Sequence, residues 1–594
     1  MSEFPSTGIQ EPPPRLKAFA ATGRALAAYL AGAALLSWAA FNWYTTIQRI
    51  VSCYLPLPFM DYWRVIENYA QYKALDPAFL WQQHNEHRIV FPEIVFALDM
   101  LTAHGREIVS LLASFLCYFS LWVVIAWTLL SDSKASRTSR VAAVLLAGIV
   151  IGWKSSASAL ARPFLLQWTM TQLAALLSLA FLTVAKTKAS SKRYLCLTIT
   201  AAVIATYSSG NGMFLWPVLI AAAFMLSLAR RQVVALAASG VVSVGCYFIG
   251  YRFLNEGPAT NVLAHPLYAL EFAGAYLSMP FGAIKSPIFG AYLGLTMLAA
   301  TIFLFIYAAR THLLQSRTAV VLFGFYAFTV LTAIITAAGR MNPSDPRFTN
   351  AEAARYLTVP LANWAIFISL CLWVAGRKRW KIFLPSVLTV FFLLLIALIC
   401  FKLRWHIHLS NQSFADIQEA MLSVENGLNA PLLIRRFFPD PHFVNEYLPE
   451  MKQNRLSIYY DPLGRWLGQP VSRFGAVGAE PVAGTIAKAC TVPSGIEVFG
   501  WADEGEKSAG YRWIVFTNEA GKIAGFGERF PAGVPSDVGG LKIPHRLSWV
   551  GFINLRIPGG AYRAYVVERD SKNLAPLQGP LVGSEAESCP TGVA

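Results

Sequence analysis

The chain alternates between long apolar stretches and short polar links. We expect eleven of the stretches to cross a membrane as helices, because about 20 mostly apolar residues span the hydrocarbon layer. The third and the fifth are short for that purpose. The stretches are 25–50, 107–130, 141–153, 165–185, 194–208, 213–229, 233–253, 288–309, 318–338, 356–375 and 382–401.

Basic residues gather in every second link. Under the positive-inside rule such links face the cytoplasm, as do Arg15, Lys17 and Arg24 before the first stretch. An odd number of spans then places everything after Phe401 on the extracytoplasmic side of a cytoplasmic (inner) membrane. The basic links hold Lys134, Arg137, Arg140, Lys186, Lys188, Lys192, Arg193, Arg230, Arg231, Arg310, Arg317, Arg377, Lys378, Arg379 and Lys381. The opposite links carry the unusual polar residues, so chemistry is expected outside.

Composition agrees with a membrane protein. The chain is 55% hydrophobic and 14% charged, with a mean hydropathy of +0.47, which is too apolar for a soluble protein of 594 residues. The net charge of +16 comes from residues 1–401, which hold 30 Lys and Arg against 14 Asp and Glu. Since this excess lies mainly beside the membrane, anionic lipid is its expected partner, and no nucleic acid is needed.

The predicted fold class is mainly α: a polytopic helical bundle with an all-β, sandwich-like domain at the carboxy end. A tail (1–24) precedes the membrane domain (25–401), whose first external loop (51–106) is long. A helical linker (402–484) leads to the β domain (485–594). The β domain is indicated by short alternating stretches separated by Gly, Pro, Asn and Asp: IEVFGWA, YRWIVFTN, KIAGFGER, WVGFINLR and YRAYVVER.

The amino-terminal apolar run after Arg24 is too long for a signal-peptide core, so we interpret it as a retained first span. Six of the eight cysteines lie in or beside apolar stretches. Cys490 and Cys589 bracket the β domain. A disulfide between these two suits an oxidising exterior, and two free thiols are the alternative.

Asp61 lies just beyond the first apolar stretch, in LPLPFMDYWRVIENYA. A carboxylate there can act as a general base toward an acceptor hydroxyl or help to hold a divalent cation. Tyr62 and Trp63 suit a membrane-interface belt as well as a sugar-stacking platform. The alternative is an acidic turn residue among belt aromatics.

Five hydrogen-bonding residues in a row follow in the same loop, before FPEIVFALDMLTAH (91–104), which is expected to lie at the interface as a helix. They are His84, Asn85, Glu86, His87 and Arg88. In a helix, His84, His87 and Arg88 would share a face. We weigh a substrate-facing cluster, a metal site from His84, Glu86 and His87, and a cap for the following helix.

The other external links add further candidates for substrate binding. Lys154 and Arg162 lie in WKSSASALARPFLLQW, and Asn211 lies between two glycines in YSSGNGMFLWP. The link at 339–356 adds Arg340, Arg347, Arg355 and Tyr356. Arginines on the side poor in positive charge either anchor lipid headgroups or grip a lipid-linked phosphate through paired donors.

The chain resembles glycosyltransferases of the GT-C class: an acidic residue follows the first span, interfacial helices lie in the first loop, and a soluble domain follows many spans. FMDYW, QHNEHRIVFPE, YSSGNGMFLWP and ARYLTVP are similar to motifs of bacterial Gtr-like and arabinosyl- or mannosyl-transferring enzymes. The resemblance covers most of 1–401. It implies inverting transfer of a sugar from a polyprenyl-phosphate donor to an extracytoplasmic glycan, lipid or protein acceptor.

That resemblance also assigns roles. Asp61 matches the catalytic acid of the first loop, and His84 and Glu86 would orient sugar hydroxyls. The departing phosphate would be neutralised by Arg88, Arg340, Arg355 or Lys154. Relatives have paired acids where this chain has Asp61, Tyr62 and, further on, Glu67. A requirement for Mg or Mn, held by residues such as Asp61, His84 and Glu86, is therefore left open.

Two other classes compete. A transporter or flippase for a lipid-linked glycan predicts ionisable residues at mid-bilayer and matching halves, and the sequence has neither. The third class is a non-catalytic assembly protein of the cell envelope. The β domain also has aromatic residues on its expected strands, which suit a core or a sugar platform: Trp501, Trp513, Phe516, Tyr562 and Tyr565.

Overall fold

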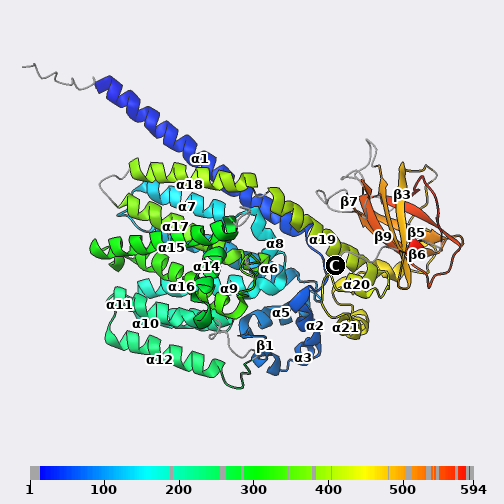
Figure 1. The fold of residues 1–594 in the computed structure, drawn as a ribbon, viewed down its shortest axis with the longest axis horizontal. Coiled ribbons are helices and arrows are strands. Elements are labelled where there is room, and N and C mark those ends of the chain that lie inside the picture. Colours follow the sequence, from blue (N-terminus) through cyan, green and yellow to red (C-terminus); the bar gives the residue numbers. More distant parts are fainter. Residues whose placement is uncertain are drawn as a thin grey trace, which may run out of the picture.

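A bundle of helices and a β domain make up the molecule, and a long helix, α19 (Arg404–Glu425), joins them (Figure 1). The fold comes from a computed structural model. It describes residues 14–186, 191–253, 262–281, 287–345, 347–377, 383–402, 404–478, 480–503, 511–529, 537–538, 541–542, 548–568, 573–583 and 587–588.

Each of the eleven predicted apolar stretches contains a helix. The helices are α1 (Pro14–Ser52), α6 (Ile108–Leu130), α7 (Arg137–Ile151), α9 (Leu166–Ala185), α10 (Ser191–Thr206), α11 (Leu215–Met225), α12 (Arg230–Tyr247), α15 (Pro287–Arg310), α16 (Arg317–Arg340), α17 (Thr358–Gly376) and α18 (Phe383–Lys402). The apolar runs therefore fold as the sequence predicts. The 39-residue α1 is much longer than its predicted span and projects beyond the bundle (Figure 1).

Five helices among the described residues are long and apolar enough to cross a membrane. They are Ile108–Leu130, Pro163–Ala185, Ile288–Arg310, Arg317–Arg340 and Thr358–Gly376, and a sixth span results if α7 and the bent continuation Lys154–Leu160 are counted together. The two parts of that pair meet at 41°. These helices make the chain a membrane-protein candidate, and the count of about eleven spans stays a prediction.

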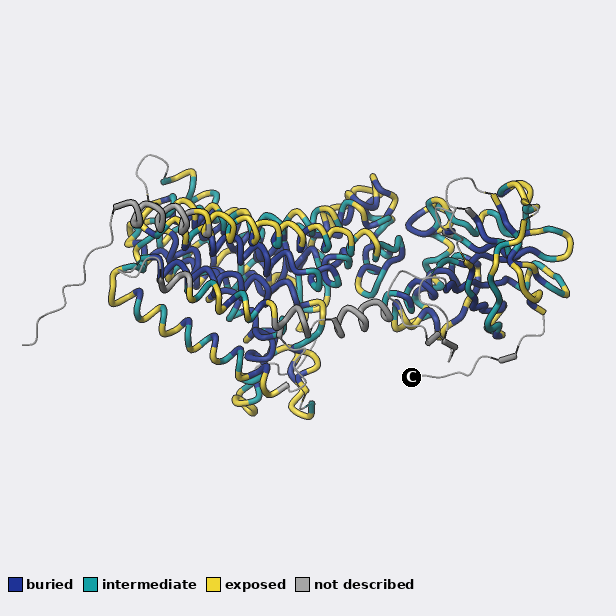
Figure 2. The backbone as a smooth tube through the Cα atoms, turned by 90° about the horizontal axis from the view of Figure 1, so that it is seen from above, coloured by how far each residue is buried: buried dark blue, intermediate teal, exposed yellow. Residues whose placement is uncertain are grey.

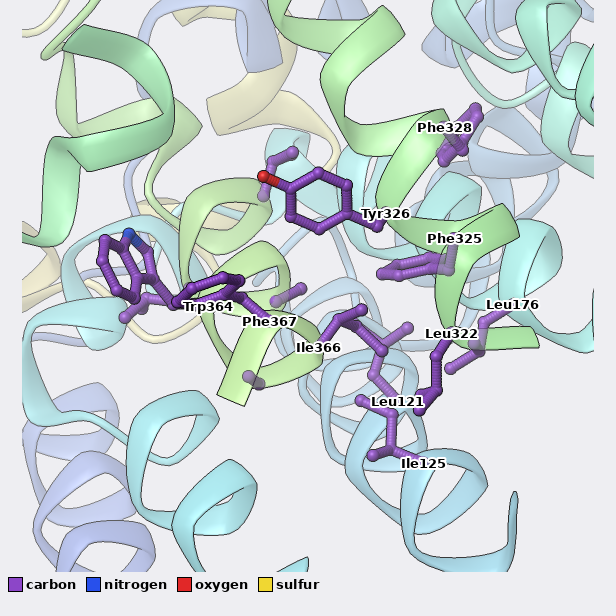
Figure 3. Packing of buried hydrophobic residues seen from close by; sticks show 14 of the residues in the cluster. Leu121, Ile125, Leu176, Leu322, Phe325, Tyr326, Phe328, Trp364, Ile366 and Phe367 are labelled. Carbon is purple, nitrogen blue, oxygen red and sulfur yellow. The ribbon is translucent and has the colours of Figure 1, made fainter. Parts of the chain in front are cut away.

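The bundle buries α17 along nearly its whole length, whereas α6 and α15 present most of their surface outward. A helix that is apolar all round belongs at the centre of a membrane bundle, and α17 has that pattern. In its interior, Ile366 of α17 lies near Leu121 of α6 and Leu322 of α16 (Figure 3). The buried residues accordingly form the inner layer and the exposed ones the rim (Figure 2).

The first external loop folds as short helices and one hairpin. They are η1 (Met60–Tyr62), α2 (Trp63–Glu67), α3 (Tyr69–Ala74), α4 (Ala78–Trp81), β1 (Gln83–His84), β2 (His87–Arg88) and α5 (Val90–Thr102). The carboxylates of α5 point into protein. Glu93 accepts a hydrogen bond from the Tyr72 hydroxyl at 2.6 Å, and Asp99 accepts from the backbone N–H groups of Glu107 and Ser110. Asp99 thereby satisfies the free amides at the start of α6.

The other external links hold short helices too. These are η2 (Lys154–Ser156), α8 (Ala157–Leu160), η3 (Pro163–Leu165), η4 (Gly210–Phe214), α14 (Pro266–Ser278), η5 (Met279–Phe281) and η7 (Ala354–Tyr356).

The linker packs on both neighbours. Beyond α19 it contains α20 (Pro431–Ile434), α21 (Pro441–Gln453), η8 (Ser457–Tyr459), η9 (Leu463–Trp466) and α22 (Val471–Phe474). Met421, Leu422 and Val424 of α19 are all buried. They share one apolar core with Trp63 of the first loop and Phe552 of the β domain. The linker is therefore packed against both parts.

The β domain is built around one nine-stranded sheet. Its strands are β3 (Gly484–Val492), β4 (Gly495–Ala502), β5 (Tyr511–Asn518), β6 (Ile523–Arg529), β9 (Ser548–Asn554), β10 (Ala561–Glu568), β11 (Leu574–Pro576), β12 (Val582–Gly583) and β13 (Glu587–Ser588). The order is β11-β10-β5-β6-β9-β4-β3-β13, with β12 on β10. The five predicted strand segments are confirmed. Instead of two stacked sheets, one sheet has both faces covered, and Ile496 and Val498 lie in a core separate from that of Phe499.

The aromatic residues of the strands are divided by burial. Phe516 and Tyr562 are fully buried in the core of the domain, as is Trp549, while Trp501, Trp513 and Tyr565 are half-buried. Cys490 on β3 is buried and disulfide-bonded, and β13 pairs with β3 at this residue. Its predicted partner Cys589 lies outside the described residues, so the pairing stays a prediction.

Candidate functional site

The links expected outside meet at one end of the bundle, the end next to α20 and α21 (Figure 1). Three hydrogen bonds tie them together although the sequence separates them widely. The N–H of Gly210 donates to Nδ1 of His87 at 3.2 Å, Arg340 donates to Glu86 at 3.0 Å, and the Gln83 amide donates to the carbonyl of Arg252 at 2.7 Å. Each of the three hydrogen bonds involves the first loop, which therefore connects the other links.

The polar run 84–88 is a hairpin, so the helical arrangement weighed from the sequence is wrong. His84 of β1 pairs with His87 of β2, and Gln83 pairs with Arg88. Asn85 turns the chain with φ +48°, a left-handed conformation that asparagine tolerates better than most residues. The hairpin lifts Glu86 to its tip, where the carboxylate meets Arg340.

Arg88 supports the backbone. It is 2% exposed, and its guanidinium donates to the carbonyls of Tyr247, Ile249 and Trp81, the first two at 2.7 and 2.5 Å. These carbonyls lie at and near the carboxy ends of α12 and α4, where helices leave acceptors unsatisfied. Arg88 is therefore occupied by protein groups and is not available to a substrate.

The two histidines are held neutral by burial. Burial lowers the pKa of His87 to about 4, and the same cause lowers the pKa of His84 to about 4. His87 must keep Nδ1 unprotonated to accept the N–H of Gly210. The ring of His84 packs on Phe164, with 4.7 Å between centroids.

Asp61 is an exposed carboxylate at this end. It lies on η1 after Met60, whose N–H donates to the carbonyl of Phe437 at 2.9 Å. The protein packed around the turn raises the pKa of Asp61, while the charges of Arg355 and Arg340 act in the opposite direction. Asp61 thus reaches solvent and lies within electrostatic range of both arginines.

Arg162 and Arg355 lie close enough for the charge of one to act on the other. Burial lowers the pKa of Arg162, and the positive charge of Arg355 lowers it further. In the described ranges no carboxylate forms an ion pair with either guanidinium. Arg162 lies over the ring of Phe59 at 4.6 Å, and Arg355 lies over Tyr356 at 5.0 Å. Two neighbouring cations of this kind favour an anionic ligand.

Tyr356 follows Arg355 in η7 and packs among aromatic rings. Its ring packs on Trp168 and Tyr276 with centroids 5.4 and 5.5 Å apart, and Trp168 also contacts the ring of His87. Tyr356 is buried, so its ring supports the neighbouring Arg355 by packing.

Asn211 and its glycines are shaped by close packing. A Cβ on Gly210 would lie 2.9 Å from Nδ1 of His87, and one on Gly212 would lie 1.9 Å from the carbonyl oxygen of Ala205. These glycines therefore allow backbone to approach protein. Asn211 is buried, and its side-chain nitrogen has no protein acceptor. That donor is available to a ligand or to water.

Lys154 lies near Arg49. It is on η2, against the end of α1, where its charge and that of Arg49 act on Cys53.

The residues considered for a cation do not gather. Among the described residues, no three His, Cys, Asp or Glu side chains are placed to share a metal ion. Glu86 is paired with Arg340, and His84 faces Phe164. The set Asp61, His84 and Glu86 does not fit Mg or Mn in this arrangement, and no step below uses a metal.

A small apolar cavity of about 20 Å³ lies between α7, α17 and α18. Its lining includes Val150, Trp153, Ser155, Pro280, Trp364 and Leu395, and neither Arg162 nor Arg355 belongs to it. The cavity is about the size of one water molecule, so it is a packing gap inside the bundle.

Sequence reasoning missed the aromatic partners of the site: Phe59, Phe164 and Trp168. Phe59 stands two residues before Asp61 in PLPFMDYW, and the other two flank Leu165 and Gln167 in ARPFLLQW. Their proximity to charged candidates was the available signal. Comparisons with family models, with curated proteins and with solved structures find no match to this chain.

Proposed function

We propose that the chain is a membrane glycosyltransferase of GT-C type. It moves a sugar from a polyprenyl-phosphate donor to a glycan, lipid or protein acceptor outside the cytoplasm. The observation that carries the proposal is that the exposed carboxylate Asp61 lies within electrostatic range of Arg355, whose charge also acts on Arg162, where η1, η3 and η7 come together at the end of an apolar bundle. A base beside an anion-binding pair suits displacement of a phosphate by a hydroxyl.

The proposed reaction is one inverting displacement at the anomeric carbon. The acceptor hydroxyl oxygen forms the new bond to that carbon, and the bond from the carbon to the phosphate oxygen breaks. Asp61 takes the acceptor proton, for which its raised pKa makes it a stronger base. Arg355 and Arg162 stabilise the negative charge that grows on the polyprenyl phosphate as it leaves.

Other site residues take positioning roles in this proposal. The carboxylate of Glu86 is oriented by Arg340 and accepts hydrogen bonds from sugar hydroxyls. The unpartnered amide of Asn211 donates to the sugar or to the phosphate. Arg88 and Lys154 are left out of the mechanism, because Arg88 is held by three carbonyls and Lys154 faces α1.

A donor carried on a lipid suits a site at the end of a bundle whose outer helices α6 and α15 present apolar surface outward. The proposal includes the topology expected from the basic links, with the amino terminus cytoplasmic and the β domain extracytoplasmic in the inner membrane.

Substitution of Asp61 tests the function. A strain that lacks the chain is complemented with wild type or Asp61→Asn, and its envelope glycans are compared by mass spectrometry. We expect wild type to restore the missing sugar and Asp61→Asn to lower transfer about 10²- to 10⁴-fold, the range typical of a lost general base. Glu67→Gln is the matched control, because Glu67 lies in the same loop and pairs with Arg64 at 3.4 Å.

Equal amounts of each variant in the membrane are checked by immunoblotting. Full restoration of the glycan by Asp61→Asn would overturn the mechanism. Unchanged glycans in the deletion strain itself would favour an assembly role instead.

A further inference from the structure

The turn that carries Asp61 is supported from behind by the linker. The carbonyl of Phe437 accepts the N–H of Met60 at 2.9 Å, and the indole of Trp63 stacks on the Phe437 ring with centroids 5.9 Å apart. Met60 has φ +48°, a conformation that residues with side chains persist in only where their surroundings hold them. The segment around Phe437 therefore sets where Asp61 lies.

Arg436 ties that segment to α19. Its guanidinium donates to the carboxylate of Glu419 at 2.5 Å. Glu419 is 6% exposed and lies where α19 packs on the β domain, opposite Glu497 of β4, which is equally buried. A line of direct contacts thus runs from the β sheet through Glu419 and Arg436 toward the Asp61 turn.

The two glutamates lie too close and too deep for both to be charged. Burial, the charge of Glu419 and the hydrogen bond with it together raise the pKa of Glu497 to about 9. Glu497 then keeps its proton at neutral pH and donates it in a hydrogen bond to Glu419. Glu419 in turn accepts the hydrogen bond from Arg436.

Other charged groups face this pair from each neighbouring element. Asp416 lies about one turn earlier on α19, and the charges of Arg436 and Glu419 both act on its pKa. Lys488 of β3 acts on Glu497, and Glu528 of β6 accepts a hydrogen bond from Gln418 at 2.9 Å. Lys488 lowers the pKa of Glu497, as Arg436 does, so the cations oppose the effect of burial.

We propose that Arg436 is a positioning residue for Asp61, held by the buried glutamates Glu419 and Glu497 where α19 meets the β domain. The β domain thereby braces the turn that carries the base. The importance of this brace for sugar transfer rests on the proposed function, whereas the coupling itself does not.

Hydrogen exchange of the full chain in detergent, read by mass spectrometry, tests the coupling without any substrate. The reporter is the peptide that contains Met60, whose amide is protected by Phe437. At pH 7 we expect Arg436→Met to speed its exchange about tenfold or more, since its support is loosened. Arg436→Lys should recover most of the protection, because an ammonium still donates to Glu419. A peptide from α16 is the internal reference for global unfolding.

The pH dependence separates positioning from simple packing. In wild type, after correction for intrinsic exchange rates, we expect protection of the Met60 peptide to fall as the pH rises through about 9, where Glu497 loses its proton. Glu497→Gln should keep its protection over this range, because the amide N–H donates to Glu419 and does not titrate. Glu446→Gln, an exposed change on α21, should behave as wild type.

Two results would overturn the proposal. One is equal exchange of the Met60 peptide in wild type and Arg436→Met, and the other is the same pH dependence in wild type and Glu497→Gln. If Arg436→Met does not fold, the Glu497→Gln comparison decides alone. Normal sugar transfer by Asp61→Asn would instead contradict the proposed function. It would not contradict the coupling between Arg436 and the turn that carries Asp61.

Discussion

An arginine at one end of the bundle is paired with a carboxylate, and two arginines at the other end are not. At the end away from the β domain, Arg377 donates to Asp132 at 2.5 Å, and Trp373 donates to the same carboxylate at 2.7 Å. Burial alone would raise the pKa of Asp132, but these hydrogen bonds lower it overall. At the other end, the charge of Arg355 acts on Arg162, and neither forms an ion pair with a carboxylate among the described residues.

The contrast distinguishes an arginine that holds the structure from one that awaits a ligand. A satisfied ion pair contributes to folding and leaves no donor for a substrate. Two neighbouring cations repel one another and gain from an added anion. The same residue type therefore has different roles at the two ends, and substitutions should separate them.

Breaking the satisfied pair should have the largest effect, and on stability. Both side chains of the Asp132–Arg377 pair are mostly buried, at 7 and 12% exposure. Asp132→Ala leaves the guanidinium and the Trp373 N–H without their acceptor, which costs about 3–5 kcal/mol. We expect a lower midpoint of thermal denaturation in detergent. An unchanged midpoint would show that the Asp132–Arg377 pair does not stabilise the fold.

The reverse pattern is expected for the unpaired cations. Arg355→Gln and Arg162→Gln should each lower sugar transfer about 10²- to 10³-fold, as loss of a donor to a developing charge does. Their thermal midpoints should stay near wild type, because no carboxylate partner is abandoned. Envelope glycan analysis and thermal denaturation of the same preparations check this. A variant that loses stability but keeps transfer would assign its arginine to the fold.

The two ends should also differ in how pH affects stability, because His87 and His84 lie at the end that holds Arg162 and Arg355. Burial holds the folded pKa of each at about 4, below the usual 6.5. Between pH 6.5 and 4 the unfolded chain takes up protons that the folded chain does not. The free energy of unfolding therefore decreases as the pH is lowered, by about 1.4 kcal/mol per pH unit for each histidine. Asp132, with its lowered pKa, adds nothing in this window.

Thermal midpoints between pH 7 and pH 4.5 measure that effect. We expect His87→Gln to reduce the slope, because glutamine does not titrate there. An identical slope in wild type, His87→Gln and His84→Gln would show that neither histidine is kept neutral by the fold.

The smallest effect is expected at the Glu86–Arg340 pair. Its side chains are 34 and 41% exposed, so solvent screens their attraction. Arg340→Gln should change stability by less than about 1 kcal/mol. A loss as large as that of Asp132→Ala would mean that this pair also holds the structure together.

The sequence predicted much of the architecture because hydrophobic periodicity reflects burial directly. The apolar stretches are helices, and the five alternating segments of the carboxy-terminal region are strands. The grouping of Asp61, Glu86 and Arg340 at one end followed from the alternation of the links. The single sheet did not, since strand order depends on pairings such as β4 with β9 that lie far apart in sequence.

The site was predicted less well where a residue's role depends on distant backbone. Arg88 looked available because nothing near it in sequence could occupy it, yet its acceptors at Tyr247 and Ile249 lie about 160 residues away. The helical alternative for 84–88 failed because the left-handed Asn85 turns the chain back. Neither Phe437 nor Arg436 had any local signal of its connection to Asp61.

The length of α1 has a practical consequence. At about 1.5 Å of rise per residue, its 39 residues extend roughly 58 Å, nearly twice the thickness of a hydrocarbon layer. As the predicted first span, a rod of that length would leave several turns outside the lipid at tilts of up to about 40°. A fluorophore or affinity handle fused ahead of Pro14 would stand clear of the other helices, at the opposite pole from Asp61, and would report on the chain without obstructing its charged end.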